Sequence, residues 1–210
     1  MTIKTQQITQ ETLDMFKKEF PNDAKIQALT LDAVLQHAET TTIDWSRLSG
    51  GVPQHTIQLQ SISITPCQKA IGYVIFDAIC LALGAVSLRS SVKASTVEAM
   101  AEAAAPVLSK IETAVAKMAA EGASYTDMAK GVFTILQTIY SGGCLGAVFS
   151  AFTASLSWWD MVLYGLTGMA TIVAALATDG AALIAEIVIE LATFGFLVSD
   201  SVKAVQACNI

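Results

Sequence analysis

The chain has 210 residues, of which 53% are hydrophobic and only 14% are charged, and its mean hydropathy is +0.55. Soluble domains usually carry about 25% charged residues, so this composition is typical of a membrane protein or of a soluble protein built around unusually apolar helices. The net charge of -6 excludes a broadly basic surface, and we therefore expect no nucleic-acid partner.

The N-terminal third differs in composition from the rest of the chain. Residues 1 to 65 are polar and mixed, whereas residues 66 to 210 are mostly apolar, so we expect a polar N-terminal region followed by an apolar helical bundle. Residues 1 to 16 lack the apolar core and the cleavage site of a secretory signal peptide. We therefore expect a soluble form in the cytoplasm, or release without a conventional signal peptide.

Two short helices and a strand-like segment are expected in the N-terminal region. Thr9 can cap a helix that reaches Phe20. Asn22 can cap a second helix that reaches about Ala38. Apolar and polar residues alternate from residue 56 to residue 65, which predicts one or two short strands. If this region binds a receptor, an exposed edge of the strand-like segment is the expected contact.

A well-marked helix start precedes the first apolar run. Thr65 and Gln68 have the spacing of a capping box, and Pro66 takes the first helical position. Residues 70 to 88 contain one charged residue, Asp77, and a continuous helix of this length would span about 28 Å, close to the hydrocarbon thickness of a bilayer. We expect Asp77 to be either a buried carboxylate with a hydrogen-bond partner or a residue that marks function in a membrane.

The helix expected over residues 95 to 121 is amphipathic. Its apolar residues recur at alternating spacings of four and three, and its charged residues occupy the other positions. Pro106 is expected to kink or split this helix, because an interior proline removes a backbone hydrogen bond. Such a helix is suited to covering helices more apolar than itself.

Three strongly apolar segments follow, at residues 131 to 159, 161 to 178 and 181 to 198. The Ser-Gly-Gly sequence at residues 141 to 143 is expected to break or bend the first segment. These patterns predict a mainly α-helical fold: a compact bundle of about six helices with a central apolar hairpin at about residues 158 to 198.

Small residues recur every four positions within the first apolar segment, a pattern that lets two helix backbones approach closely. A close crossing in a soluble core would use the same pattern. The candidate helix-packing residues are Gly142, Gly146, Ser150 and Ala154. Trp158 and Trp159, which follow them, are candidates for a membrane interface or for an anchor at a helix start in a soluble core.

Acidic residues in the apolar segments are the candidates for membrane insertion and pH sensing. Glu186 and Glu190 are four residues apart and share one helix face, which in a soluble fold would point to water. An ionised acid at the centre of a membrane-spanning helix costs about 2.5 to 3.5 kcal/mol. Desolvation raises a carboxyl pKa, so acidification would favour insertion. Asp179, in the turn before this helix, and Asp77 complete the set.

The sequence contains no motif for catalysis or for metal binding. The four cysteines show no Cys-x-x-Cys spacing and the chain has only two histidines, so we expect no zinc site, no cofactor and no enzymatic activity. Cys80 and Cys144 lie in apolar runs and are expected to be buried thiols. A bridge between Cys67 and Cys208 is compatible with the sequence but cannot be deduced from it.

These features favour an α-helical pore-forming toxin, which stays soluble until it inserts the hairpin into a target membrane, assisted by acid. In organisation, residues 66 to 207 resemble the pore-forming domains of colicins, in which a helical bundle encloses a hydrophobic hairpin. We expect a lipid membrane as the partner and a homo-oligomer as the active form. Two alternatives remain open: a constitutive integral membrane protein with about four spans, and a soluble helical protein that binds a partner or self-assembles.

Overall fold

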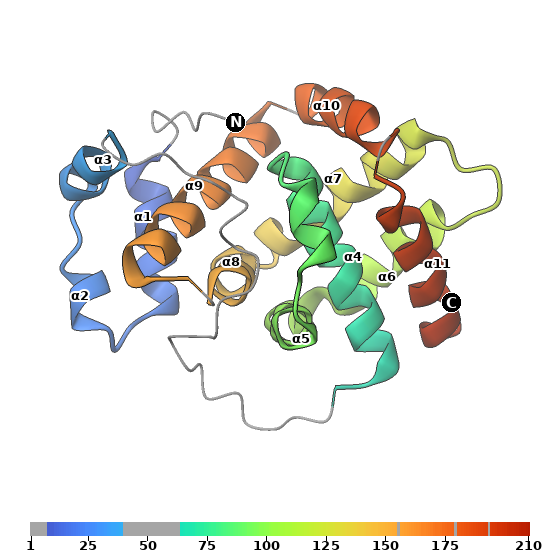
Figure 1. Cartoon of the computed structure of the whole chain (residues 1–210), viewed down its shortest axis with the longest axis horizontal. Helices are drawn as coiled ribbons and strands as arrows, with labels where there is room; N and C mark the ends of the chain where they lie inside the picture. The colour runs from blue at the N-terminus through green and yellow to red at the C-terminus, as the bar shows by residue number, and fades with distance from the viewer. Residues whose placement is uncertain (1–7, 40–63, 155, 179, 193) are drawn as a thin grey trace.

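The computed structural model describes residues 8–39, 64–154, 156–178, 180–192 and 194–210 (Figure 1). Within these residues the fold is mainly α-helical and contains no strand. The strand-like segment predicted for residues 56 to 65 falls almost entirely outside the described residues, as does the receptor contact expected there. The α-helices are α1 (Gln10–Glu19), α2 (Ala24–Gln27), α3 (Leu31–Glu39), α4 (Pro66–Ala82), α5 (Ala94–Ala103), α6 (Leu108–Met118), α7 (Tyr125–Ser141), α8 (Leu145–Thr153), α9 (Trp158–Ala177), α10 (Ala181–Leu191) and α11 (Phe196–Cys208), with 3-10 helices η3 (Val86–Ser90) and η4 (Ala105–Val107).

The helix starts follow the capping residues of the sequence. The Thr65 side chain accepts a hydrogen bond from the Gln68 backbone N–H at 3.2 Å, and the Gln68 side chain accepts one from the Thr65 N–H at 2.9 Å. This capping box, predicted from the sequence, satisfies two of the amide groups that a helix start leaves unpaired. Thr9 caps α1 in the same way.

Several predicted helices are shorter than their apolar runs. The helix expected to begin at Asn22 is two helices, because Asp23 caps α2 and Thr30 accepts from the Ala33 N–H at the start of α3. The long run at residues 70 to 88 is likewise not one helix, since α4 ends at Ala82 and Gly84, with φ of 62°, turns the chain into η3. Residues 66 to 210 therefore divide into more, shorter helices than the six expected.

The helix α4 occupies the centre of the molecule (Figure 1). It packs against α11 and α5 most extensively, and against α6, α7 and α10 at other points on its surface. Residues from Ile71 to Ala82 on α4 are buried with one exception, Tyr73. The centre is therefore this helix, whereas the predicted hairpin at residues 158 to 198 does not form a pair of packed helices: α10 packs mainly on α7.

The N-terminal helices cover a second group of helices. Helix α1 packs against α8 and α9, and α8 in turn packs against α5, which links this group to α4. Phe16 of α1 is completely buried. The arrangement places α1, α2 and α3 beside α9, on the side of the molecule away from α11 (Figure 1).

Candidate functional site

Helix α9 is the only helix in the described part of the chain that is long and apolar enough by itself to cross a membrane. Its 20 residues correspond to a length of about 30 Å. Of its most apolar 18-residue stretch, 61% is buried inside the protein. Two bent pairs also have the composition of a span, α7 with α8 at 107° and α10 with α11 at 96°. Length and composition thus allow one span, or up to three if each bent pair straightens.

Glycines on α9 let aromatic rings approach its backbone. A Cβ atom added at Gly168 would lie 2.2 Å from Cε1 of Phe149 on α8, and one added at Gly165 would lie 2.7 Å from Cε2 of Phe16 on α1. Any larger residue at these two positions would separate α9 from the helices that cover it. The contacts of α9 with α1 and α8 are therefore close and leave no room for a larger side chain at Gly165 or Gly168.

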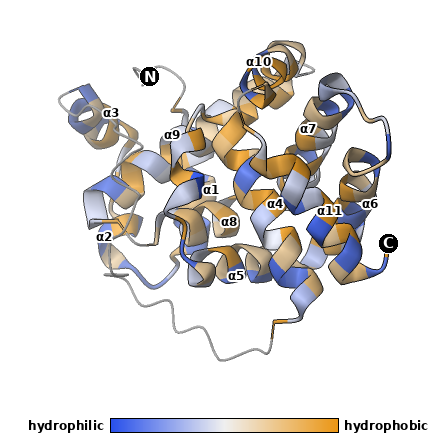
Figure 2. Ribbon diagram, turned by 45° about the vertical axis from the view of Figure 1, so that its right-hand side comes forward, coloured by the Kyte–Doolittle hydropathy of each residue, from blue (hydrophilic) through white to orange (hydrophobic). Residues whose placement is uncertain are grey.

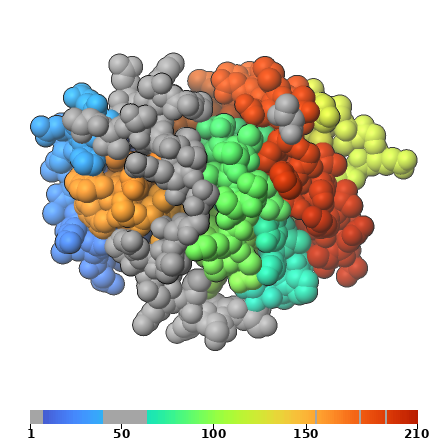
Figure 3. All heavy atoms as spheres, in the orientation of Figure 1, coloured from blue at the N-terminus to red at the C-terminus, as the bar shows by residue number. Residues whose placement is uncertain are grey.

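The cover is less complete toward the end of α9. Val173 and Leu176 are half-buried, and Ala177 and Thr178 are exposed. In the space-filling view, the beginning of α9 also reaches the molecular surface beside the N-terminal helices (Figure 3). The one long apolar helix in the described residues is thus buried on all sides in its middle and only partly covered over its last two turns.

Trp158 and Trp159 lie at the start of α9 and contact both each other and the N-terminal region. The Trp159 ring stacks on His37 of α3 with 4.1 Å between centroids, and the two tryptophan rings meet edge to face at 4.7 Å. Ser157 caps the helix by accepting from the Asp160 N–H at 3.4 Å. The two tryptophans therefore connect the start of α9 to its N-terminal cover.

The chain turns from α9 into α10 at Gly180, whose φ of 69° lies in the left-handed region. A Cβ atom there would lie 2.0 Å from the ring of Phe133 on α7, so both backbone conformation and space require glycine. Asp179, the candidate acid of this turn, lies outside the described residues. The close approach of Gly180 fixes the α9–α10 turn on α7.

Glu186 and Glu190 lie on α10 at the periphery of the molecule. Leu183, Ile187 and Leu191 form the buried stripe of this helix, while Glu186 is exposed and Glu190 is half-buried. Figure 2 shows that α10 is nevertheless largely apolar, and Ile189 leaves 73% of its surface exposed. An exposed carboxylate thus lies on a helix whose outer side also presents an uncovered aliphatic side chain.

The small residues predicted to form one packing row are divided between two helices. Gly142 follows the last residue of α7, whereas Gly146 and Ser150 lie in α8, and the expected break at residues 141 to 143 accounts for the separation. A Cβ atom at Gly142 would lie 2.3 Å from Val107, and one at Gly146 would lie 2.6 Å from Glu19. The two glycines therefore allow close approach to different neighbours. Ala154 lies at the end of α8.

Asp77 lies in a cluster of ionisable residues at the contact between α4 and α11, in which the two aspartates are buried and Lys203 is exposed. Arg89 of η3 places Nε 3.0 Å from Asp77 Oδ1 and 3.1 Å from Asp200 Oδ2, and its Nη2 also contacts Asp200. Lys203 Nζ lies 2.9 Å from the other Asp200 oxygen. We call Asp77, Arg89, Asp200 and Lys203 the Arg89 cluster. The Arg89 guanidinium also lies over the Tyr73 ring, 4.5 Å from its centroid.

Burial and the adjacent Asp200 carboxylate raise the pKa of Asp77 to about 8, although Arg89 opposes this rise. The Asp77 side chain is 0% exposed. A carboxyl group with this pKa is already largely protonated at pH 7, so acidification to pH 5 changes its charge very little. The raised pKa of Asp77 therefore argues against this residue as a sensor of acidification. Its geometry supports a role in holding α4 and α11 together.

The partners of Asp77 were not predicted from the sequence. Arg89 is the only arginine in the part of the chain that the structure describes, and an isolated acid in an apolar helix requires a basic partner. These facts could have suggested Arg89. Nothing in the sequence identifies Asp200, which is 111 residues away from Arg89.

A disulfide joins Cys67 at the start of α4 to Cys208 at the end of α11. Cys67 Sγ also lies 3.8 Å from Glu112 Oε1 of α6. Among the described residues, Cys67, Glu112 and Cys208 form the one group whose ligand atoms lie close enough together to hold a metal ion. Both sulfur atoms are already bonded to each other in the disulfide. Cys80 and Cys144 are free and buried, as expected.

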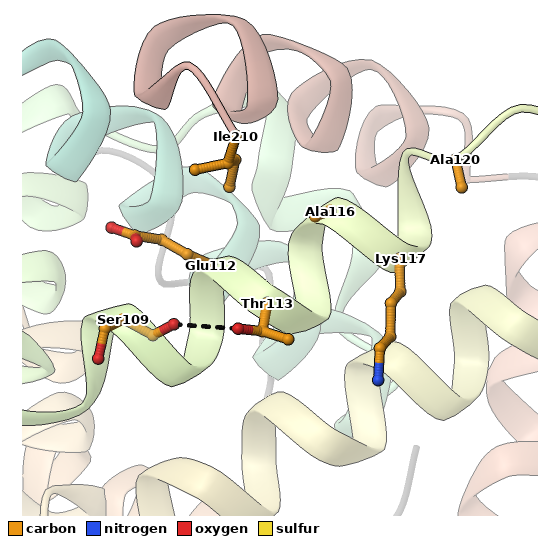
Figure 4. Close-up of a pocket in the computed structure, with 7 residues that line it drawn as sticks. All are labelled: Ser109, Glu112, Thr113, Ala116, Lys117, Ala120 and Ile210. Carbon is orange, nitrogen blue, oxygen red and sulfur yellow. Dashed lines mark hydrogen bonds between the residues drawn. The ribbon is translucent and has the colours of Figure 1, made fainter.

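A groove of about 490 Å³ runs along α6 beside this disulfide (Figure 4). Glu112 and Ile210 lie toward one end of the groove, and Lys117 lies farther along α6 with its side chain extending away from Ile210. The residues that line the groove include no cluster of catalytic side chains.

Comparison with known proteins does not identify a function for the chain, since no protein-family model, curated protein or solved structure matches it.

Proposed function

We propose that the protein is a helical pore former, held in a soluble bundle until α9 inserts into a lipid membrane, where several copies assemble. The observation that carries this proposal is the position of α9. It is long and apolar enough to span a bilayer, it packs mainly against α8 and α1, and it is buried all round from Met161 to Ala170 but only partly covered from Thr171 to its end. A helix of this kind can leave the bundle without dismantling the centre around α4.

The second part of the proposal concerns α10, which must accompany α9 because only a short turn joins them. Glu186 keeps the outer face of α10 hydrated in the soluble form. In a bilayer each ionised carboxylate would cost about 2.5 to 3.5 kcal/mol near the helix centre. Protonation of Glu186 and Glu190 removes this cost, so acidic pH assists insertion of α10.

The experiment is dye release from phospholipid vesicles by protein purified without detergent, at pH 7 and pH 5, measured both with the Cys67–Cys208 disulfide intact and after its reduction. A pore former releases dye, and does so more rapidly at pH 5. A constitutive membrane protein would require detergent to remain in solution, and a soluble binding protein would neither require detergent nor release dye. Chemical crosslinking of the vesicle-bound protein tests for the homo-oligomer.

A pair of lysine substitutions tests whether α9 is the inserting helix. Ala174 on α9 and Ala116 on α6 are both half-buried alanines, but only Ala174 belongs to the candidate span. Lysine costs up to about 3 kcal/mol at the centre of a membrane-spanning helix and less near its end, where its ammonium group can reach the interface, so we expect Ala174→Lys to lower dye release several-fold. Ala116→Lys should change it less than about twofold. Equal release by the two variants would exclude α9 as the inserting segment.

A further inference from the structure

Helix α11 is attached to the centre of the molecule at two places. The disulfide fixes its last residue, Cys208, to the second residue of α4, Cys67. Toward its other end, Asp200 is held by Arg89. Asp200 and Cys208 are separated by about 12 Å along the helix. One attachment is therefore covalent, and the other is a buried ion pair in the Arg89 cluster.

The covalent attachment limits how far α9 and α10 can move. The chain runs from α9 through a short turn to α10 and then directly into α11. When α9 moves into a membrane, α10 must separate from α7 and α4, and it pulls on α11. As long as the disulfide is intact, α11 remains bonded to α4, so the segment from α9 to α11 cannot leave the bundle as a unit.

The disulfide is accessible to a reducing agent. Cys67 and Cys208 are both half-buried, and Glu112, which contacts Cys67, also lines the open groove on α6 (Figure 4). Cys80 and Cys144, in contrast, are buried. Among the described cysteines, a reductant in solution therefore acts on this pair.

We propose that the Cys67–Cys208 disulfide is a redox-controlled restraint, and that its reduction by a dithiol releases α11 from α4 and permits membrane insertion. This inference rests on the proposed function. Two electrons and two protons pass from the dithiol to the disulfide, the S–S bond breaks, Cys67 and Cys208 become thiols, and the dithiol becomes a disulfide. Insertion is then confined to reducing surroundings and suppressed in oxidising ones.

The test compares oxidised protein, protein reduced with dithiothreitol and the double variant Cys67→Ser/Cys208→Ser in the vesicle assay. We expect reduction to increase the rate of dye release at least tenfold. The double variant should release dye at the rate of the reduced protein without reductant, and dithiothreitol should not change that rate further. Equal release by oxidised and reduced protein, or faster release by the oxidised form, would overturn the proposal.

Hydrogen exchange of α11 separates this inference from the proposed function. Reduction should accelerate amide exchange in α11 at least tenfold while exchange in α5 changes less, in the absence of any membrane. If no form releases dye but α11 loses protection on reduction, pore formation fails and the redox restraint stands. If protection of α11 is unchanged, or if mass spectrometry of the air-oxidised protein finds both thiols free, the redox restraint fails.

Discussion

Replacing Asp77 with asparagine is expected to stabilise the protein at neutral pH. The asparagine side chain has nearly the shape of a protonated aspartic acid, and it cannot ionise. The wild-type side chain is buried beside Asp200, and its pKa is raised to about 8. The folded protein therefore retains a proton on Asp77 at pH 7, whereas an aspartate in the unfolded chain has lost it.

The magnitude follows from linkage between proton binding and folding. The unfolded pKa is 3.8 and the folded pKa is about 8, so between these values the folded state binds more protons. The contribution of Asp77 to the free energy of unfolding therefore falls as pH rises through this range and is constant above it. At about 1.4 kcal/mol per pH unit, the loss between pH 4 and pH 7 is about 4 kcal/mol. Because Asp77 is coupled to Asp200 and Arg89, this value is an upper limit.

The assay is urea unfolding followed by circular dichroism at pH values from 4 to 8. Asp77→Asn should match the wild type near pH 4 and exceed its free energy of unfolding by up to about 4 kcal/mol at pH 7. The control is Asp127→Asn, since hydrogen bonds from Ser124 lower the pKa of the exposed Asp127. That group contributes stability above its unfolded pKa and loses it as pH falls. An Asp77→Asn variant that is less stable than the wild type at pH 7 would show that Asp77 is ionised and would refute the reasoning.

Three further outcomes are expected. Glu186→Gln/Glu190→Gln should release dye at a higher pH than the wild type in the vesicle assay, because no proton is then needed to neutralise α10; an unchanged pH profile would remove these carboxylates from the mechanism. Gly168→Ala should lower the free energy of unfolding by about 1 to 3 kcal/mol, because its Cβ would overlap the Phe149 ring. The control Gly195→Ala, where a Cβ has open space, should be neutral or slightly stabilising, and equal losses would contradict the packing argument. Reduction of the disulfide, which closes a loop of 141 residues, should lower the free energy of unfolding by up to about 5 kcal/mol, and an unchanged urea midpoint would show that the bond contributes nothing.

The parts of the fold that could be predicted from the sequence are governed by local interactions. The caps at Thr9 and Thr65 depend on residues three positions apart, and both are confirmed. The break at residues 141 to 143 is also confirmed, because α7 ends at Ser141 and Gly143 has φ of 71°. The mainly helical character follows from the same local patterns.

The tertiary contacts could not be predicted because they join residues far apart in the sequence. A run of apolar residues indicates burial but does not identify the helix at the centre, and the central helix is α4. Gly84, whose left-handed backbone turns the chain just after α4 ends at Ala82, was not predicted to stop that helix. Asp200 and Arg89 are paired only by the packing of α11 on α4. Single-sequence patterns contain no information on such pairings.

The contact between α1 and α9 has a consequence for protein synthesis. Phe16 leaves the ribosome long before Gly165, the residue against which its ring packs. At 5 to 20 residues per second, the interval is on the order of 10 s. The helices that cover the apolar span are therefore already made when the span emerges. Under the proposed function, this order of synthesis would keep α9 from the membranes of the cell that produces it.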